Sequence, residues 1–439
     1  MIFPDSSESG IGTEKTALVS SSRWGTLFSQ DPHVIDSPED RDPSEEWGKA
    51  LAVMDCFSGR SATLRKLYDR FGRSIPALYR ALTGCLNSGA NSVVGDLSVD
   101  GSISRRSNDL ARSLLTYDAT RALSWLSGVS GRVTAVGQEG FPWPADALPE
   151  GPPFLVMAGQ AWPPEVPTVA IVGTRRATGT GIEVAEIMAF GLASHGVRVI
   201  SGLARGIDTA AHEGSLAATR GRPMLCGNHA VAGAVLGCGL SYVYPPENAA
   251  VYRRLLTEGV LISQYGLFNP PRKWAFPERN RTMAALADVV VVVESYARGG
   301  SLSTAHAALE LGKEVAAVPG SALSPASDGT FSLLRDGAVP VRTAEDVLEI
   351  LAALPKFAGW HERLTKAAGS TQAPGELLKT LDPNAEKVAQ LLLDGRPRSI
   401  VEIGSVCGLR IGDVIRALEK IEESGMLRSD ESEKFRVSI

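Results

Sequence analysis

The sequence predicts an α/β fold in which a small helical domain precedes an open parallel sheet and a winged helix follows it. Three observations predict this arrangement. Short apolar runs rich in Val and Ile alternate with amphipathic stretches in the middle of the chain, apolar residues recur every three or four positions before it, and three helical patterns with two strand-like pieces end the chain. Strands that are apolar throughout and alternate with helices are typical of a parallel sheet covered on both faces.

The chain begins with residues 1–46, a segment rich in Ser, Asp, Glu and Pro and poor in aliphatic side chains. This composition cannot bury enough surface to order itself, so we expect a disordered tail. From Trp47 apolar side chains recur at helical spacing, which predicts a small helical domain over residues 47–140. Within it a Gly-, Ser- and Asn-rich stretch, residues 84–108, precedes a second helical stretch, Leu110–Leu126.

Prolines mark a linker near Phe141 and Gly151, and residues 141–354 are expected to form the parallel-sheet domain. Its predicted strands are Thr168–Val172, Val197–Ile200, Gly233–Leu236, Val260–Ile262, Val289–Val293 and Val315–Val318. Amphipathic stretches such as Ile182–Ser194 and Leu302–Leu311 lie between most of them and are expected to be helices.

Residues 355–381 are rich in Gly, Ser, Thr and Pro and are expected to be a linker, and residues 382–439 are expected to form a winged helix. The predicted helices are Ala385–Leu393, Ile400–Val406 and Ile411–Glu423, followed by strand-like pieces at Met426–Arg428 and Phe435–Val437. The last of these helices carries more acidic than basic residues, which opposes contact with phosphates. Docking of a protein is therefore favoured over duplex recognition, and a structural role also stays open.

Bulk composition limits the class of protein. The chain has 439 residues, 44% of them hydrophobic and 21% charged, and a net charge of -5, so binding of a nucleic acid needs a local cluster of cations. Five scattered cysteines without a C-x-x-C pair argue against disulfides and structural zinc. Neither a signal peptide nor a membrane-spanning run is recognised, which favours a cytoplasmic protein without a membrane association.

Two glycine turns follow the first two predicted strands. The first is Gly173-Thr174-Arg175-Arg176, and the second contains Gly202 and Arg205. A strand, a glycine turn and a helix start present backbone N–H groups to an anion. The first turn lacks the lysine of a P-loop, and the second strand lacks the acidic residue that holds a ribose, so neither ATP hydrolysis nor NAD binding is favoured. Tight turns without a ligand remain the alternative.

Further cations and glycines follow later strands and are expected at the same edge of the sheet, where parallel sheets bind ligands. They are Lys273, Phe276, Arg279, Asn280, Arg281, Gly300 and Ser301. Cations suit the phosphates of a nucleic acid, and an aromatic face such as that of Phe276 can stack on a base. Ordinary core packing is the alternative for Trp274 and Phe276.

No catalytic or metal-binding group is expected, and no cofactor. Asp208 and His212 share a helix face, but without a third ligand a capping Asp and a packing His are favoured over a metal site. Glu294 could act as a general base, yet no Ser, Cys or His partner stands beside it in the sequence.

An ordered series of motifs between about Pro152 and Leu351 resembles the DNA-processing protein A family, also called Smf. The motifs are Ile171-Val172-Gly173-Thr174-Arg175, Ser201 to Asp208 with Ala211-His212, Tyr244-Pro245-Pro246-Glu247-Asn248, Phe276-Pro277 with Asn280-Arg281, and Gly300-Ser301-Leu302. The resemblance implies a Rossmann-like domain. It also makes the segment after Trp47 similar to the family's flanking helical module of the SAM or helix-hairpin-helix kind, although a second glycine near Gly59 is missing.

The resemblance implies a non-enzymatic protein that binds single-stranded DNA, self-associates as a homodimer and delivers the strand to the RecA recombinase in transformation or recombination. DNA contacts are implied for Arg175, Lys273 and Phe276. A nucleotide-binding or nucleotide-cleaving enzyme or sensor of the same fold is the alternative. Four features depart from the family pattern: Glu278, Gln264, Phe331 and an extra segment from Arg222 to Ala230.

Overall fold

The structure is a computed structural model of the 439-residue chain. It describes residues 43–87, 112–138, 140–143, 147–148, 150–219, 230–360, 381–392, 398–423, 427–429 and 434–437. The expected tail lies almost entirely outside these residues, but its expected end at residue 46 is wrong because a helix already begins at Pro43. Most of the stretch 84–108, the linker after residue 360 and the extra segment before Ala230 also lie outside them.

One nine-stranded sheet forms the centre of the fold, in the order β1-β2-β6-β5-β4-β3-β7-β8-β9. The strands are β1 Arg132–Ala135, β2 Phe154–Gly159, β3 Thr168–Val172, β4 Arg198–Ser201, β5 Ala232–Leu236, β6 Val260–Ser263, β7 Val289–Val292, β8 Glu314–Ala317 and β9 Val339–Pro340. Neighbours from β6 to β9 pair in parallel, whereas β2 pairs antiparallel with β6 and β1 antiparallel with β2. The six predicted strands are all present, so the prediction of a parallel α/β sheet is confirmed.

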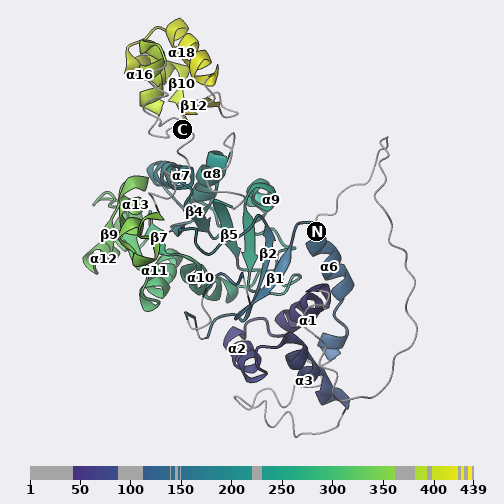
Figure 1. The fold of residues 1–439 in the computed structure, drawn as a ribbon. Coiled ribbons are helices and arrows are strands. Elements are labelled where there is room, and N and C mark those ends of the chain that lie inside the picture. Colours follow the sequence, from purple (N-terminus) through teal and green to yellow (C-terminus); the bar gives the residue numbers. More distant parts are fainter. Residues whose placement is uncertain are drawn as a thin grey trace, which may run out of the picture.

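Helices cover both faces of this sheet (Figure 1). They are α7 Gly179–Ser194, α8 Ile207–Thr219, α9 Ala249–Glu258, α10 Ala275–Leu286, α11 Gly300–Glu310, α12 Asp328–Arg335 and α13 Ala344–Ala353, with short 3-10 turns η2 Pro246–Asn248, η3 Pro325–Ser327 and η4 Pro355–Phe357. Val169 and Ile171 of β3 pack in one core with α7, α8 and α13, and Ala170 and Val172 pack in the other with α10 and α11. This alternation explains why the strand is apolar at every position.

The strand order reverses beside β3, because β4 lies on one side of it and β7 on the other. At such a reversal, open α/β sheets bind ligands outside the carboxyl ends of the strands. In this chain the turns that follow β3 and β7 are joined there, because the Thr174 N–H donates to the Glu294 carbonyl at 2.8 Å. Helix α7 begins beside this reversal, and Thr178 caps it by accepting a 3.0 Å hydrogen bond from the Gly181 N–H.

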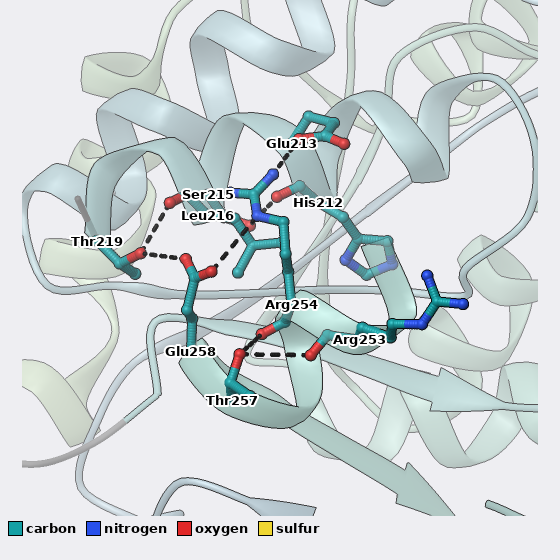
Figure 2. Close-up of polar contacts among 9 residues, drawn as sticks. All are labelled: His212, Glu213, Ser215, Leu216, Thr219, Arg253, Arg254, Thr257 and Glu258. Atoms are coloured by element: carbon teal, nitrogen blue, oxygen red, sulfur yellow. Dashed lines mark hydrogen bonds and ion pairs between the residues drawn. The ribbon is translucent and has the colours of Figure 1, made fainter. Parts of the chain in front are cut away.

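Two helices on one face of the sheet are joined by a charged network, shown in Figure 2. Arg254 of α9 donates from Nη1 to Glu213 Oε2 of α8 at 2.5 Å, and its Nε lies 3.5 Å from Glu258 Oε1. The Thr219 hydroxyl, near the end of α8, lies 3.3 Å from Glu258 Oε2. The network thus links the two helices at two points, Arg254 with Glu213 and Glu258 with Thr219.

Helices of the N-terminal part lie on the β1 side of the sheet (Figure 1), and among the described residues they include α1 Pro43–Cys56, α2 Ser61–Arg70, α3 Ile75–Asn87 and α6 Ala119–Ser127. Their buried side chains belong to the same core as one face of the sheet. The boundary expected after residue 140 therefore does not separate two cores, and β1, which precedes it, is a strand of the sheet. β1 and β2 were not predicted, because β2 follows prolines in a stretch interpreted as a linker.

The C-terminal part has a core of its own. Its elements are α16 Pro383–Leu392, β10 Arg398–Ser399, α17 Ile400–Cys407, α18 Ile411–Glu423, β11 Leu427–Ser429 and β12 Lys434–Val437. The three strands pair antiparallel in the order β10-β12-β11. The helices and the last two strands occur in the predicted order, and assignment as a winged helix stays a prediction.

Candidate nucleic-acid interface

The turn between β3 and α7 is held close to its neighbours. An added Cβ on Gly173 would lie 2.8 Å from Ile207 Cβ of α8, so only glycine lets the turn approach that helix. The Thr174 N–H donates to the Glu294 carbonyl at 2.8 Å. Arg175 and Arg176 are exposed, and the Arg176 guanidinium lies 5.4 Å from the centre of the Tyr296 ring. The turn therefore presents two cations outward from a fixed backbone.

Asp208 and His212 of α8 hold the turn between β4 and α8 in place. Asp208 Oδ2 accepts from the N–H groups of Gly202 and Ala204 at 3.1 and 3.3 Å, and His212 Nε2 accepts from the Leu203 N–H at 3.2 Å. Burial lowers the pKa of His212 to about 3, in keeping with a neutral ring that accepts at Nε2. Asp208 therefore binds the turn that precedes α8 instead of capping the helix as expected, and these bonds fix the backbone around Arg205.

An open pocket of about 80 Å³ lies between the two turns. It is lined by Arg175, Gly202, Ala204, Arg205, Tyr244, Pro245, Pro246 and Phe276. Pockets that enclose small molecules usually measure about 300 to 1,000 Å³. This pocket is too small to enclose a whole dinucleotide, but it can receive one flat or anionic group of a larger ligand that lies along the surface.

Aromatic and cationic groups meet in this pocket. The rings of Tyr244 and Phe276 lie 5.6 Å apart between centres at an angle of 42°, and the Arg175 guanidinium lies 5.6 Å from the centre of the Phe276 ring. Phe276 is half-buried and packs on Gly237, where an added Cβ would lie 2.8 Å from its Cδ1. Phe276 thus packs on the protein with one part and lines the pocket with another. Tyr244, 39% exposed, was not among the predicted site residues, although it stands in one of the quoted motifs.

The Trp274 side chain is partly exposed to solvent and partly packed against the protein. It is 43% exposed, yet it packs edge-on against Tyr265, with 5.8 Å between ring centres. In the turn between α1 and α2, an added Cβ on Gly59 would lie 3.0 Å from the indole. Trp274 thereby anchors the segment that carries the exposed Lys273.

Two predicted contact residues lie in the interior. Arg279 is only 4% exposed and donates from Nη1 to the carbonyls of Gly202 and Val235 at 2.7 and 2.6 Å. Ser301 is 8% exposed, and its hydroxyl donates to Ser295 Oγ at 2.9 Å. Both side chains are thus turned inward and not outward as expected. Arg279 supports the pocket from beneath through Gly202, whereas Ser301 is bonded to Ser295 after β7. Gly202 is buried as well, and an added Cβ there would lie 2.6 Å from Arg279 Cζ.

The remaining predicted residues lie along α10 and α11. The Asn280 amide donates to Ser303 Oγ at 2.7 Å, and Arg281 pairs with Glu310 at 3.4 Å, so both join the two helices. Gly300 is exposed at the start of α11, where Gly299 supplies no capping side chain. Backbone N–H groups at this helix start are therefore available to an anion.

The N-terminus of α7 is engaged by a carboxylate of the protein itself. Glu294, after β7, accepts from the Thr178 N–H at 2.9 Å with Oε2 and from the Thr178 hydroxyl at 2.5 Å with Oε1. An added Cβ on Gly181 would lie 2.5 Å from Glu294 Oε2. Both oxygens of the group considered as a general base are thus bound to the helix start.

Two departures from the family pattern contact each other. Gln264 Nε2 donates to Glu278 Oε2 at 3.4 Å, and the Tyr265 hydroxyl donates to the same oxygen at 3.4 Å. Burial raises the pKa of Glu278. Its carboxyl group is turned towards these two partners, and Gln264 Nε2 also lies 3.4 Å from Ser61 Oγ of α2. The half-buried Phe331 lies on α12, and nothing in the structure explains it.

Within the part of the chain that the structure describes, no three His, Cys, Asp or Glu side chains gather as metal ligands would. In the same residues, none of the helices has the length and apolar character needed to cross a membrane.

Comparison with known proteins identifies relatives of the central part of the chain. Residues 132–352 match the family model described as DNA recombination-mediator protein A. A putative DNA processing protein DprA of Mycobacterium tuberculosis is 37% identical over 257 residues, which are 58% of this chain and 61% of the relative. The DNA processing protein DprA of Streptococcus pneumoniae is 36% identical over 208 residues, 47% of this chain and 70% of the relative.

The fold agrees with these matches. The X-ray structure of the Streptococcus pneumoniae DprA superimposes with a TM-score of 0.51 at 27% sequence identity and covers 70% of this chain and 98% of that one. The match spans less than two thirds of the Mycobacterium tuberculosis relative. The matched model covers about half of the chain, and the Rossmann-like sheet with its motifs lies within it: the chain belongs to the DNA recombination-mediator protein A family.

Proposed function

We propose that the chain binds single-stranded DNA along the carboxyl edge of its sheet and acts as a recombination mediator in DNA processing. One observation carries the proposal: the pocket in which Arg175 lies over Phe276 and beside Tyr244. A guanidinium can contact a phosphate while the neighbouring rings stack on a base, which is how proteins bind unpaired strands. The names of the relatives, which describe DNA processing, support the same class of ligand.

Exposed cations extend the pocket along the surface. Arg176 lies beside Arg175 in the same turn, Arg205 projects from the turn after β4, and Lys273 precedes α10. A polyanion can contact several of these groups at once, whereas a mononucleotide can contact few. With Gly173 and Thr174 in the first turn and Gly300 at the start of α11, they form the proposed contact surface.

A strand binder fits this pocket better than an enzyme does. The alternative, a nucleotide-binding or nucleotide-cleaving enzyme, needs an enclosed phosphate site and a free base. The pocket encloses only about 80 Å³, and Glu294 is bound by Thr178 through both oxygens. We therefore propose binding without catalysis.

Delivery of the strand to the RecA recombinase, homodimer formation and a cytoplasmic location are the finer parts of this proposal. Their support is membership of the family. The helical module around Gly59 and the winged helix are proposed as flanking domains, the latter for docking a protein.

The proposal is tested by fluorescence anisotropy of a labelled oligonucleotide with the full chain. Arg175→Glu and Lys273→Glu should each weaken binding by roughly tenfold or more, because a cation that contacts a phosphate becomes a repelling charge. Arg335→Glu is the matched control. Arg335 is exposed in the last turn of α12, just before β9, at the opposite edge of the sheet.

Unchanged affinity of both Arg175→Glu and Lys273→Glu for the oligonucleotide, or an equal loss in the Arg335→Glu control, would contradict the assignment of this surface. Release of a base or phosphate from a panel of nucleotides by the parent chain would support the enzyme instead.

A further inference from the structure

The reversal of strand order beside β3 is the position at which nucleotide-binding sheets hold a phosphate. The first helix after the central strand starts there, and its free N–H groups and dipole attract an anion. In this chain that helix is α7, which follows β3 at the reversal of strand order. The position is filled by the side chain of Glu294.

Glu294 reaches this position from another strand. It follows β7, 116 residues further along the chain than Thr178, and accepts from the Thr178 N–H and hydroxyl at 2.9 and 2.5 Å. Capping of α7 does not require it, since the Thr178 hydroxyl already accepts from the Gly181 N–H at 3.0 Å. The carboxylate is therefore an additional hydrogen-bond acceptor, and an anion, at a helix start that is already capped.

Gly181 makes room for this carboxylate. A Cβ on Gly181 would lie 2.5 Å from Glu294 Oε2 and 2.7 Å from Oε1, so any other residue would displace the side chain. In nucleotide-binding turns, glycines at such positions let a phosphate approach the backbone. Here the same absence of a side chain admits a carboxylate of the protein.

We propose that Glu294 is a specificity-determining residue that occupies the phosphate position of the fold and so excludes free phosphate and nucleoside phosphates. Its carboxylate satisfies the donors that a phosphate would use, and its charge repels a second anion. The exclusion stands on the contacts of Glu294 alone. Its consequence, that a bound strand lies in the pocket beside Arg175 rather than at the start of α7, rests on the proposed function.

The inference is tested with the full chain and two variants. Glu294→Ala removes the carboxylate and opens the space beside Thr178, whereas Glu294→Gln keeps that space filled and keeps an oxygen that can accept from the Thr178 N–H. Calorimetric titration with orthophosphate and with ADP should detect binding to the Ala variant with a Kd at least about tenfold lower than to the parent or the Gln variant. The melting temperature of the Ala variant should also rise with phosphate more than that of the parent.

A parent chain that binds orthophosphate as tightly as the Ala variant would overturn the proposal, as would an Ala variant that folds and gains no phosphate binding. If the Ala variant does not fold, Glu294→Ser is titrated in its place and judged by the same two criteria. Oligonucleotide anisotropy on the same parent sample separates the two hypotheses. A parent that binds neither phosphate nor DNA contradicts the proposed function and leaves the exclusion by Glu294 intact.

Discussion

At the residue scale, Glu247 limits the positive charge of the pocket. It forms an ion pair with Arg205, both side chains being mostly exposed, and it lies in the turn beside Pro246, which lines the pocket. Its own backbone N–H, and then Arg205, lower the pKa of its carboxyl group, so it carries its charge at neutral pH. Under the proposed function, Arg205 exchanges this partner for a phosphate of the bound strand.

Removal of this competing charge should strengthen DNA binding. Glu247→Gln is expected to lower the Kd for an oligonucleotide roughly two- to fivefold at low salt, the range of exposed ion pairs. Asp336→Asn makes the same change of charge at the exposed Asp336, at the opposite edge of the sheet, and should have little effect. Weaker binding of the Gln variant, or equal gains in both, would contradict a contact between Arg205 and DNA.

The free energy of unfolding should depend on pH through His212, which accepts a hydrogen bond from the turn that carries Arg205. This histidine is neutral when it accepts from the Leu203 N–H, and burial, followed by the charge of Arg279, lowers its pKa to about 3. The unfolded chain takes up this proton near pH 6.5, so the unfolded state binds more protons below that pH. The contribution of His212 is full above pH 6.5 and is lost as pH falls towards 3.

Urea unfolding at pH 7.5 and 5.5 measures this effect. The parent should lose about 1.4 kcal/mol per pH unit below 6.5 relative to His212→Gln, in which an amide oxygen can accept from the Leu203 N–H without titrating. Parallel pH profiles of the two chains would show that His212 is not the titrating group.

The sequence predicted part of the site at the residue scale. Arg175, Arg176, Arg205 and Lys273 are exposed as expected, because they follow strand ends at one edge of the sheet. Strand ends do not show which way a side chain points, so Arg279 was expected on the surface although it lies beneath it. Tyr244 was missed as a pocket residue since it follows no predicted strand directly.

At the scale of elements, α7 and α8 pack at unusually close range. An added Cβ on Gly214 of α8 would lie 2.9 Å from the Glu186 carbonyl carbon of α7, a contact with backbone that cannot move aside alone. Both helices start at the turns that bear the arginines, so this contact fixes the spacing of the two turns.

Gly214→Ala should therefore lower the free energy of unfolding by about 1 to 3 kcal/mol, as overpacking does. Urea denaturation measures the change, with Gly179→Ala at the start of α7 as the control, because an added Cβ there meets no atom within 4 Å. A Gly214 variant as stable as the control would contradict the close packing of these helices.

The sequence predicted elements better than boundaries between domains. The six parallel strands were recognisable because strands buried on both faces are apolar at every position. β1 and β2 were not, since Phe154–Gly159 stands among prolines and its partner strand is short. Whether helices share a core with a sheet depends on contacts between distant residues, such as Ser61 with Gln264, which periodicity does not reveal.

At the scale of the whole molecule, an arginine is buried at the amino ends of the strands and others are exposed at the carboxyl ends, which are called here the amino and carboxyl edges of the sheet. At the amino edge Arg198 is fully buried, lies 3.8 Å from the centre of the Trp162 ring and donates to the Thr168 hydroxyl at 3.1 Å. At the carboxyl edge Arg175 and Arg205 are exposed around the pocket. Only exposed cations can exchange counterions for phosphates, which gives a mildly acidic protein a local surface for a polyanion.

The central claim is that this carboxyl edge contacts the phosphates of a single strand, and the salt dependence of binding tests it most directly. For the parent chain, the logarithm of the association constant should fall linearly with the logarithm of salt concentration, with a slope of about 0.7 per phosphate contacted. Arg175→Ala should reduce that slope by about 0.7, the loss of one contact, whereas Arg335→Ala should leave it unchanged. A slope near zero for the parent, or the same slope for the parent and the Arg175 variant, would contradict the account.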